Sequence, residues 1–144
     1  MGEALLDALD DLAIELVGLT ALALAQGGDE RDLTLAQWRA LALIASADGV
    51  RASDLAPRIG MSRPSMSRLV RRLERKGLIH AETDPSDRRA AILTSTPIGR
   101  QAIHDTRARR RRMVADALAR RGRPLPHDLQ AGLRAVLAAL EATG

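Results

Sequence analysis

Residues 62–72 combine side chains that recognise nucleic acid. This stretch places serine hydroxyls among four arginines. An arginine guanidinium can pair with a guanine edge or with a phosphate, and a serine hydroxyl bonds to base edges with less selectivity. We assign base edges to the start of the stretch and phosphates to its end. The base-edge residues are Arg63, Ser65, Ser67 and Arg68, and the phosphate residues are Arg71 and Arg72.

A helix is predicted between Ser62 and Gly77, and it would place the apolar and the polar side chains of this stretch on opposite faces. Ser62 is a favourable N-cap, Pro64 falls in the first turn where its missing N–H costs little, and Gly77 suits the C-terminal end. The apolar face predicts an anchor in the core, and the polar face is either open to DNA or only a solvated basic surface. At about 100° per residue, the apolar face holds Met66, Leu69, Val70 and Leu73, and the polar face holds Pro64, Ser67, Arg68, Arg71 and Arg75.

A shorter helix, centred on Leu55 and Ile59, is predicted before this one, with residues 60–62 as a tight turn between the two. A turn of this length holds two helices at a steep angle and lets only the second enter the major groove. Pro57 removes an intrahelical hydrogen bond unless the helix starts late, so we expect Ser53 to be its cap.

A β-hairpin is predicted directly after these helices. Its two strands and turn are Leu78–Thr83, Ala90–Ser95 and Asp84–Asp87. Arg88 and Arg89 lie at its tip, where an arginine can enter the minor groove. We expect Asp87 to hold the guanidinium of Arg89 by a charge-assisted hydrogen bond. The alternative is an ordinary surface turn with two solvated arginines.

Six motifs in this order resemble the MarR family, the multiple-antibiotic-resistance type of transcription regulator. They are Leu33–Trp38, Ser53–Ala56, Met61–Val70, Leu73–Ile79, Asp84–Arg89 and Thr96–Arg100. The resemblance is strongest from about residue 33 to residue 100, and Asp87 with Arg89 is its most specific part. Thr96 as N-cap and Pro97 at the first helical position predict the start of the next helix.

The resemblance implies one domain, mainly α-helical with a small β-wing. Residues 33–100 would form a winged helix-turn-helix lobe, and residues 1–32 and 101–144 the dimerisation helices. Members are DNA-binding dimers, mostly repressors, and many release DNA when a small aromatic or anionic effector binds. Residues 62–72, Ser62 and Pro64 included, would then lie in the major groove of double-stranded DNA, and Arg88 or Arg89 in the minor groove.

Composition and length exclude other classes of function. At 144 residues the chain has no room for an added catalytic domain, and it has no phosphate loop, nucleophile elbow or paired-carboxylate pattern, so we expect no enzyme. It has no cysteine, and its three histidines are scattered, so we expect neither a redox switch nor a metal or other cofactor. Its apolar runs are too short to cross a bilayer, so we expect a cytoplasmic protein.

The basic charge is concentrated after Val50. Residues 1–50 have a net charge of −7, residues 51–100 of +6 and residues 101–144 of +5. This asymmetry favours a polyanionic partner for the middle of the chain. An arginine run at residues 107–112 could pair with the acids of the first helix within or across subunits, remain solvated, or touch phosphates. Those acids are Asp7, Asp10, Asp11 and Glu15.

Two apolar stripes at helical spacing lie near the two ends of the chain. The first is Leu5, Leu9, Leu12 and Leu16, and the second is Leu129, Leu133, Val136, Leu137 and Leu140. Such stripes belong either to an intrachain core or to a subunit interface, and the resemblance to a dimeric family favours the interface. The function we predict is a homodimeric repressor of a palindromic operator, released by an effector. The alternative is an interaction or general DNA-binding protein of the same fold without operator readout.

Overall fold

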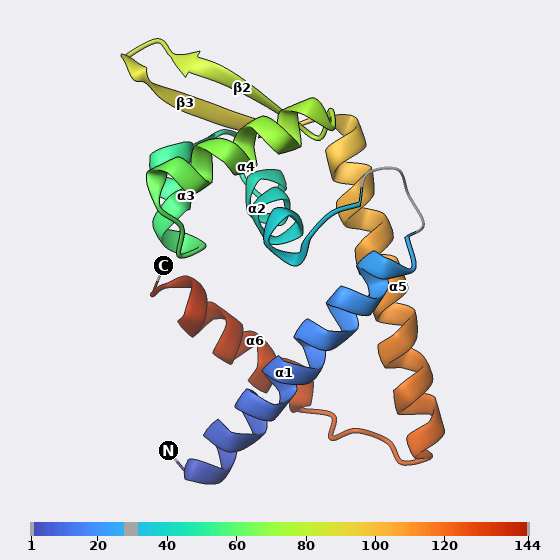
Figure 1. The fold of residues 1–144 in the computed structure, drawn as a ribbon. Coiled ribbons are helices and arrows are strands. Elements are labelled where there is room, and N and C mark those ends of the chain that lie inside the picture. The colour runs from blue at the N-terminus through green and yellow to red at the C-terminus, as the bar shows by residue number, and fades with distance from the viewer. Residues whose placement is uncertain (1, 28–31, 144) are drawn as a thin grey trace. The chain divides into compact units, whose positions relative to one another are not determined.

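The computed structural model describes residues 2–27 and 32–143 (Figure 1). Its elements are α1 (Glu3–Ala25), α2 (Leu35–Ala45), β1 (Val50–Arg51), α3 (Ala52–Arg58), α4 (Arg63–Arg75), β2 (Ile79–Asp84), β3 (Asp87–Ser95), α5 (Pro97–Arg121) and α6 (Leu129–Glu141). The mainly helical fold with a small β-wing is therefore confirmed. Residues 1–113 and residues 114–144 form two compact units. None of the described helices is both long and apolar enough to cross a membrane.

The core of the first unit lies between α2, α3, α4 and the sheet. Its centre contains the buried side chains of Leu41, Ile44, Leu55, Leu73, Leu78 and Leu93. With a single aromatic residue in the chain, aliphatic side chains fill this core. Burying one such side chain stabilises a fold by about 1.5–3 kcal/mol. The core therefore fixes α4 by its apolar face and leaves the opposite face in solvent.

Side-chain caps set the ends of the helices that surround the core. Thr34 and Gln37 form a reciprocal capping box at the start of α2, with distances of 3.2 Å and 3.3 Å. Thr96 caps α5, since its Oγ1 accepts a 3.0 Å hydrogen bond from the N–H of Gly99. The predicted cap at Thr96 and helix start at Pro97 are therefore confirmed.

Helix α3 begins earlier than predicted. It starts at Ala52, directly after Arg51, and Ser53 is not its cap. The cause is the pairing of β1 with β3, which keeps the backbone extended as far as Arg51 and leaves Ala52 as the first residue free to turn. Pro57 lies inside this helix, one residue before its end at Arg58, and its missing N–H leaves one intrahelical hydrogen bond unmade.

The sheet has the strand order β1-β3-β2, and both pairings are antiparallel. The hairpin is longer than predicted, since β2 continues to Asp84 and β3 begins at Asp87. Thr83 pairs with Ala91, but Asp84 pairs with Asp87, so residues 88–90 of β3 bulge between two successive pairs. A bulge of this kind turns side chains away from the regular ladder. The two arginines at the tip lie in this bulge.

Candidate nucleic-acid interface

Helix α4 has the two faces that the sequence predicts. Met66, Leu69, Val70 and Leu73 are buried. Ser62 is the N-cap, and its Oγ accepts a hydrogen bond from the backbone N–H of Ser65 at 3.4 Å. The polar face is exposed, except for Ser65, which is half-buried. Its exposed residues are Ser62, Arg63, Pro64, Ser67, Arg68, Arg71, Arg72 and Arg75.

Gly77 ends α4, as predicted. Its φ of +69° lies in the left-handed region that glycine adopts without strain. The N–H of Gly77 donates to the carbonyl of Glu74 at 2.8 Å, and the N–H of Leu78 donates to that of Leu73 at 3.0 Å. This Schellman arrangement directs the chain from the end of α4 into β2, so that α4 and the β2–β3 hairpin lie next to each other (Figure 1).

Ser65 and Arg68 are bonded to each other within α4. Arg68 donates from its Nη2 to the Oγ of Ser65 at 3.2 Å, and that hydroxyl also lies 3.1 Å from the Oγ of Ser62. The bond holds the guanidinium of Arg68 toward the N-terminal end of α4. Ser65 therefore positions an arginine in the free protein, which limits its freedom to bond to a base itself.

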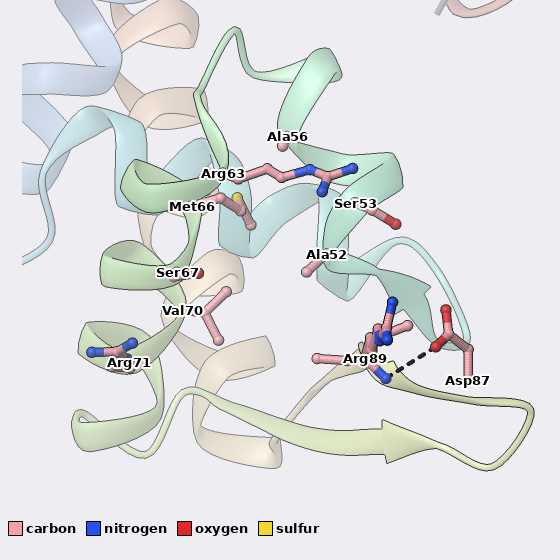
Figure 2. A pocket seen from close by; sticks show the side chains of 12 residues that line it. Ala52, Ser53, Ala56, Arg63, Met66, Ser67, Val70, Arg71, Asp87 and Arg89 are labelled. Atoms are coloured by element: carbon pink, nitrogen blue, oxygen red, sulfur yellow. Dashed lines mark hydrogen bonds between the residues drawn. The ribbon is translucent and has the colours of Figure 1, made fainter.

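A groove of about 510 Å³ separates α3, α4 and the wing. Figure 2 shows Arg63 reaching across it toward α3 and Arg89 entering it from β3. Of the predicted DNA-binding residues, it brings together Arg63, Ser67, Arg71 and Arg89. Arg68 and Arg72 instead line two other hollows of the α4 surface, and Arg88 lines none of these three.

Asp87 supports the wing in a different way from the one predicted. Its Oδ1 accepts a 3.0 Å hydrogen bond from the backbone N–H of Arg89 (Figure 2), and these described residues form no ion pair through the Arg89 guanidinium. The bulge at residues 88–90 explains the difference, because these residues have no paired residue in β2 and the Asp87 carboxylate accepts from the N–H of Arg89 instead. The carboxylate fixes the backbone of the tip, and the guanidinium remains available.

The sequence did not reveal a polar cluster at the other side of the wing tip. Asp84 forms an ion pair with Arg51, and its Oδ1 accepts hydrogen bonds from the N–H and the hydroxyl of Ser86 at 2.9 Å and 2.8 Å. The Ser86 N–H, the Ser86 hydroxyl and the Arg51 guanidinium together lower the pKa of Asp84, although burial opposes them. The Asp-Pro-Ser turn signalled the bonds to Ser86, but nothing local signalled Arg51.

The arginine run of α5 contacts the opposite end of α1 from the one expected. Arg109 donates to the carbonyl of Ala23 at 2.8 Å, and Arg110 donates to the hydroxyl of Thr20, also at 2.8 Å. Both lie near the C-terminal end of α1, where helix carbonyls attract cations. Within the described part of one chain, the run forms no ion pair with the α1 acids. The intrachain prediction for Asp7, Asp10, Asp11 and Glu15 is therefore wrong, and pairing across subunits stays a prediction.

Arg110 and Trp38 form a second polar feature beside α1. The guanidinium carbon of Arg110 lies 5.3 Å from the centroid of the Trp38 ring, within the range of a cation–π interaction. Burial, followed by the charge of Arg107, lowers the pKa of Arg110. The Nε1 atom of Trp38 is buried and has no hydrogen-bond partner among the described residues.

The predicted dimerisation residues have little contact with the rest of their own units. On α1, Leu5, Leu12 and Leu16 are exposed, and Leu9 is half-buried. The second unit gives the same pattern on α6, where Val136 is half-buried. The exposed residues of that stripe are Leu129, Leu133, Leu137 and Leu140.

Comparison with known proteins agrees with this geometry. The sequence model of the MarR family matches residues 31–90. A relative from Thauera aromatica, named for transcriptional regulation of the hcr operon, is 43% identical over 63 residues. That match covers 44% of this chain and only 38% of the relative, so the chain spans well under half the length of that protein.

Solved structures match over nearly the whole chain. RV1404 from Mycobacterium tuberculosis is 26% identical with a TM-score of 0.74, over 99% of this chain and 93% of its own. NadR, solved in complex with 4-hydroxyphenylacetate, is 25% identical with a TM-score of 0.70, over 92% of this chain and 89% of its own. The arginine face of α4, the basic wing and these matches lead to one conclusion: over residues 31–90 the chain is similar to the MarR family of transcription regulators.

Proposed function

We propose that this protein is a sequence-specific, double-stranded-DNA-binding repressor that acts as a homodimer on a palindromic operator. The observation that carries the proposal is the exposed arginine face of α4 beside the basic bulge of the wing. A helix of this kind fits the major groove, and a basic ribbon beside it fits the adjacent minor groove. A regulator of this kind acts on the chromosome, and therefore in the cytoplasm.

The proposed contacts divide by position along α4. Arg63, Ser67 and Arg68 belong to its first half and would reach base edges, and Arg71 and Arg72 would bond to phosphates. Ser65 would act through the 3.2 Å bond to Arg68. Arg88 and Arg89 would neutralise the backbone or enter the minor groove. This division predicts both sequence preference and a strong dependence on salt.

The apolar stripes on α1 and α6 support a dimer. Exposed leucines at helical spacing are costly in water and are relieved by a second copy of the same surface. Two α4 helices in one dimer would then meet half-sites about one helical turn apart, roughly 34 Å. The operator is therefore proposed to be an inverted repeat.

Release by an effector is supported by Arg110 and Trp38. The guanidinium has no carboxylate partner within the described residues, and the indole N–H lacks an acceptor there. A small aromatic acid could stack on Trp38, pair with Arg110 and accept from the indole. NadR binds a molecule of that chemistry, 4-hydroxyphenylacetate. We propose an effector of this class for the present chain.

Binding of such an effector can be measured by fluorescence, because Trp38 is the only tryptophan in the chain. Titration with 4-hydroxyphenylacetate should change the fluorescence of Trp38 and weaken DNA binding in parallel. Arg110→Ala should abolish both effects, whereas Arg107→Ala, which removes the same charge from an exposed position, should keep them. A fluorescence change that Arg110→Ala leaves intact would remove this site from the proposal.

The alternative function is an interaction or general DNA-binding protein of the same fold without operator readout. Competition between a selected palindrome and random duplex DNA distinguishes the repressor from this alternative. The wild-type protein should bind a selected palindrome at least 10³ times more tightly than random duplex, within the range for specific regulators. The affinity should fall with salt by about 0.9 log units per neutralised phosphate for each log unit of salt. Equal affinity for both duplexes would favour the alternative.

A further inference from the structure

Arg51 links the wing tip to the start of α3. It is the last residue of β1 and directly precedes α3. Its guanidinium forms an ion pair with Asp84 Oδ2, and its Nη2 donates a 3.2 Å hydrogen bond to the Oγ of Ser86. Asp84 and Ser86 flank Pro85 in the hairpin turn. One side chain therefore joins the helix-turn-helix to the turn that carries the basic bulge.

The strand order makes this link a long-range one. Arg51 pairs with Ile92 of β3, whereas Asp84 ends β2, on the other side of β3. The Arg51 side chain therefore spans the central strand to reach its partner. The other side-chain hydrogen bonds that the structure gives for described residues 84–89 join those residues to one another. Arg51 provides the polar restraint from outside the hairpin.

The surroundings of Asp84 make the link stronger than an ordinary surface ion pair. The Asp84 side chain is only 6% exposed, and that of Arg51 is 43% exposed. Removing the partner of a buried, hydrogen-bonded charge costs far more than removing a solvated pair, because the remaining charge is left uncompensated. Residues 88–90 in the adjacent bulge have no paired residue in β2, so the register of the sheet does not fix the tip by itself.

We propose that Arg51 is a positioning residue for DNA binding, because it holds the turn at Asp84 and Ser86 so that Arg88 and Arg89 meet DNA together with α4. This inference rests on the proposed function. It adds a residue that lies outside both the recognition helix and the wing. Arg51 acts on DNA through the wing, by fixing where the tip lies relative to α3 and α4.

The competing role for Arg51 is a direct phosphate contact, and Asp84→Asn separates the two. This variant keeps the Oδ1 acceptor for Ser86 and leaves Arg51 in place, but it removes the ion pair. If Arg51 bound phosphate, freeing its guanidinium and removing a negative charge would leave binding unchanged or tighter. If Arg51 positions the wing, the same variant binds DNA more weakly, against the trend of net charge.

The experiment uses the full-length chain and a labelled duplex carrying the sequence that the wild-type protein enriches most from sheared genomic DNA. Arg51→Ala and Asp84→Asn should each weaken binding by about tenfold, the middle of the range for residues of one polar network. The double variant should bind no more weakly than either single one. Asp48→Asn is the matched control, because it removes the same charge from an exposed residue, and it should not weaken binding.

Four further readouts distinguish positioning from loss of folding. Hydroxyl-radical footprints of both variants should lose protection at the minor-groove flanks and keep it across the major-groove half-sites. Arg51→Lys, which keeps the charge, should recover part of the affinity. In a chain that already carries Arg88→Ala and Arg89→Ala, Arg51→Ala should have no added effect. Thermal unfolding of each variant verifies that it is folded.

The outcomes separate this inference from the function on which it rests. Wild-type protein that enriches no operator would overturn the proposed function, and the role of Arg51 with it. Wild-type protein that binds its operator, with Asp84→Asn binding equally well or more tightly, would overturn the role of Arg51 alone. Unchanged flank protection in a folded Arg51→Ala variant would do the same.

Discussion

Arg68 and Arg72 lie four residues apart on α4, yet they are expected to contribute differently. Arg68 is held toward the start of the helix by Ser65, at 3.2 Å, and belongs to the part that would enter the groove. Arg72 lies one turn later, where a helix leaves the bases and approaches phosphates. A guanidinium at each position carries the same charge, so position along the helix decides whether it contributes specificity or only affinity.

Alanine at each position tests this division. Arg68→Ala should lose about 1–3 kcal/mol at a single base pair and relax the preference there. Arg72→Ala should weaken binding to all sequences alike and reduce the salt slope by about one. Affinities measured for a library of single-base operator variants would check both. A change of preference at one base pair for Arg72→Ala would contradict the assignment.

The lowered pKa of Asp84 determines how the stability of the wing should depend on pH. Its pKa is lowered from the ordinary value of 3.8 by Ser86 and Arg51. The carboxylate is therefore favoured by folding, and its stabilisation is complete above pH 3.8 and lost as the pH falls through the lowered pKa. Unfolding of Asp84→Asn should need less denaturant than wild type near neutral pH, and the difference should shrink in acid. A difference that grows below pH 3.8 would contradict this sign.

At the scale of elements, close packing between α5 and Leu78, the residue before β2, restricts position 99 to glycine. A Cβ at Gly99 would lie 2.0 Å from the backbone oxygen of Leu78, and a backbone atom cannot move aside as a flexible side chain can. The same region contains the cap of α5, where the Thr96 hydroxyl also donates to the carbonyl of Gly77 at 2.6 Å. Residues 77, 78 and 99 thus connect the end of α4, the start of the wing and the start of α5.

Gly99→Ala should therefore destabilise the fold by about 3 kcal/mol, the upper part of the usual range for overpacking. Gly18→Ala is the matched control, since among the described residues nothing beyond its own stretch of helix backbone lies within 4 Å of the added Cβ. The control should be neutral or stabilise α1 by up to about 1 kcal/mol. Chemical denaturation of both variants would measure the difference, and equal stability would show that the contact is softer than the geometry indicates.

Local chemistry made several element boundaries predictable. Ser62, Gly77 and Thr96 each form a hydrogen bond with a residue three positions away, so their roles follow from the sequence itself. The start of α3 was not predictable in this way, because the pairing of β1 with β3 decides it. The bulge in β3 likewise gave Asp87 a backbone partner instead of a guanidinium.

The candidate site likewise contains residues that the sequence predicts and residues that only the tertiary structure brings in. The arginine face of α4 and its apolar anchor follow from helical periodicity, and the structure reproduces both. Arg51 could not be found from the sequence, since its partner Ser86 is 35 residues away and the contact depends on the strand order. The contacts of Arg109 and Arg110 with α1 also depend on tertiary packing.

At the scale of the whole molecule, the exposed leucines of α1 argue for a second copy of the chain. Leu5 is 48% exposed, as is Ile98 on α5, but Leu5 belongs to a stripe and Ile98 does not. A single exposed apolar side chain is ordinary, whereas a stripe indicates an interface. Dimerisation and operator symmetry are therefore linked, and one should not persist without the other.

Leu5→Asp should shift the protein toward monomer and weaken operator binding together. Ile98→Asp is the control, because it places the same charge at an equally exposed residue outside the stripe. It should leave the dimer intact. Sedimentation equilibrium of both variants, alongside DNA titrations, would measure the two effects. A dimer that survives Leu5→Asp and substitution of Leu12 would remove the α1 stripe from the interface.

The central claim is that one dimer reads a specific palindrome. The most direct measurement is selection of fragments from sheared genomic DNA by the purified protein at near-physiological salt, followed by sequencing of what it retains. We predict enrichment of an inverted repeat whose half-sites are centred about one helical turn apart. Uniform recovery of the genome, or recovery of no DNA, would contradict the claim and favour the interaction protein of the same fold.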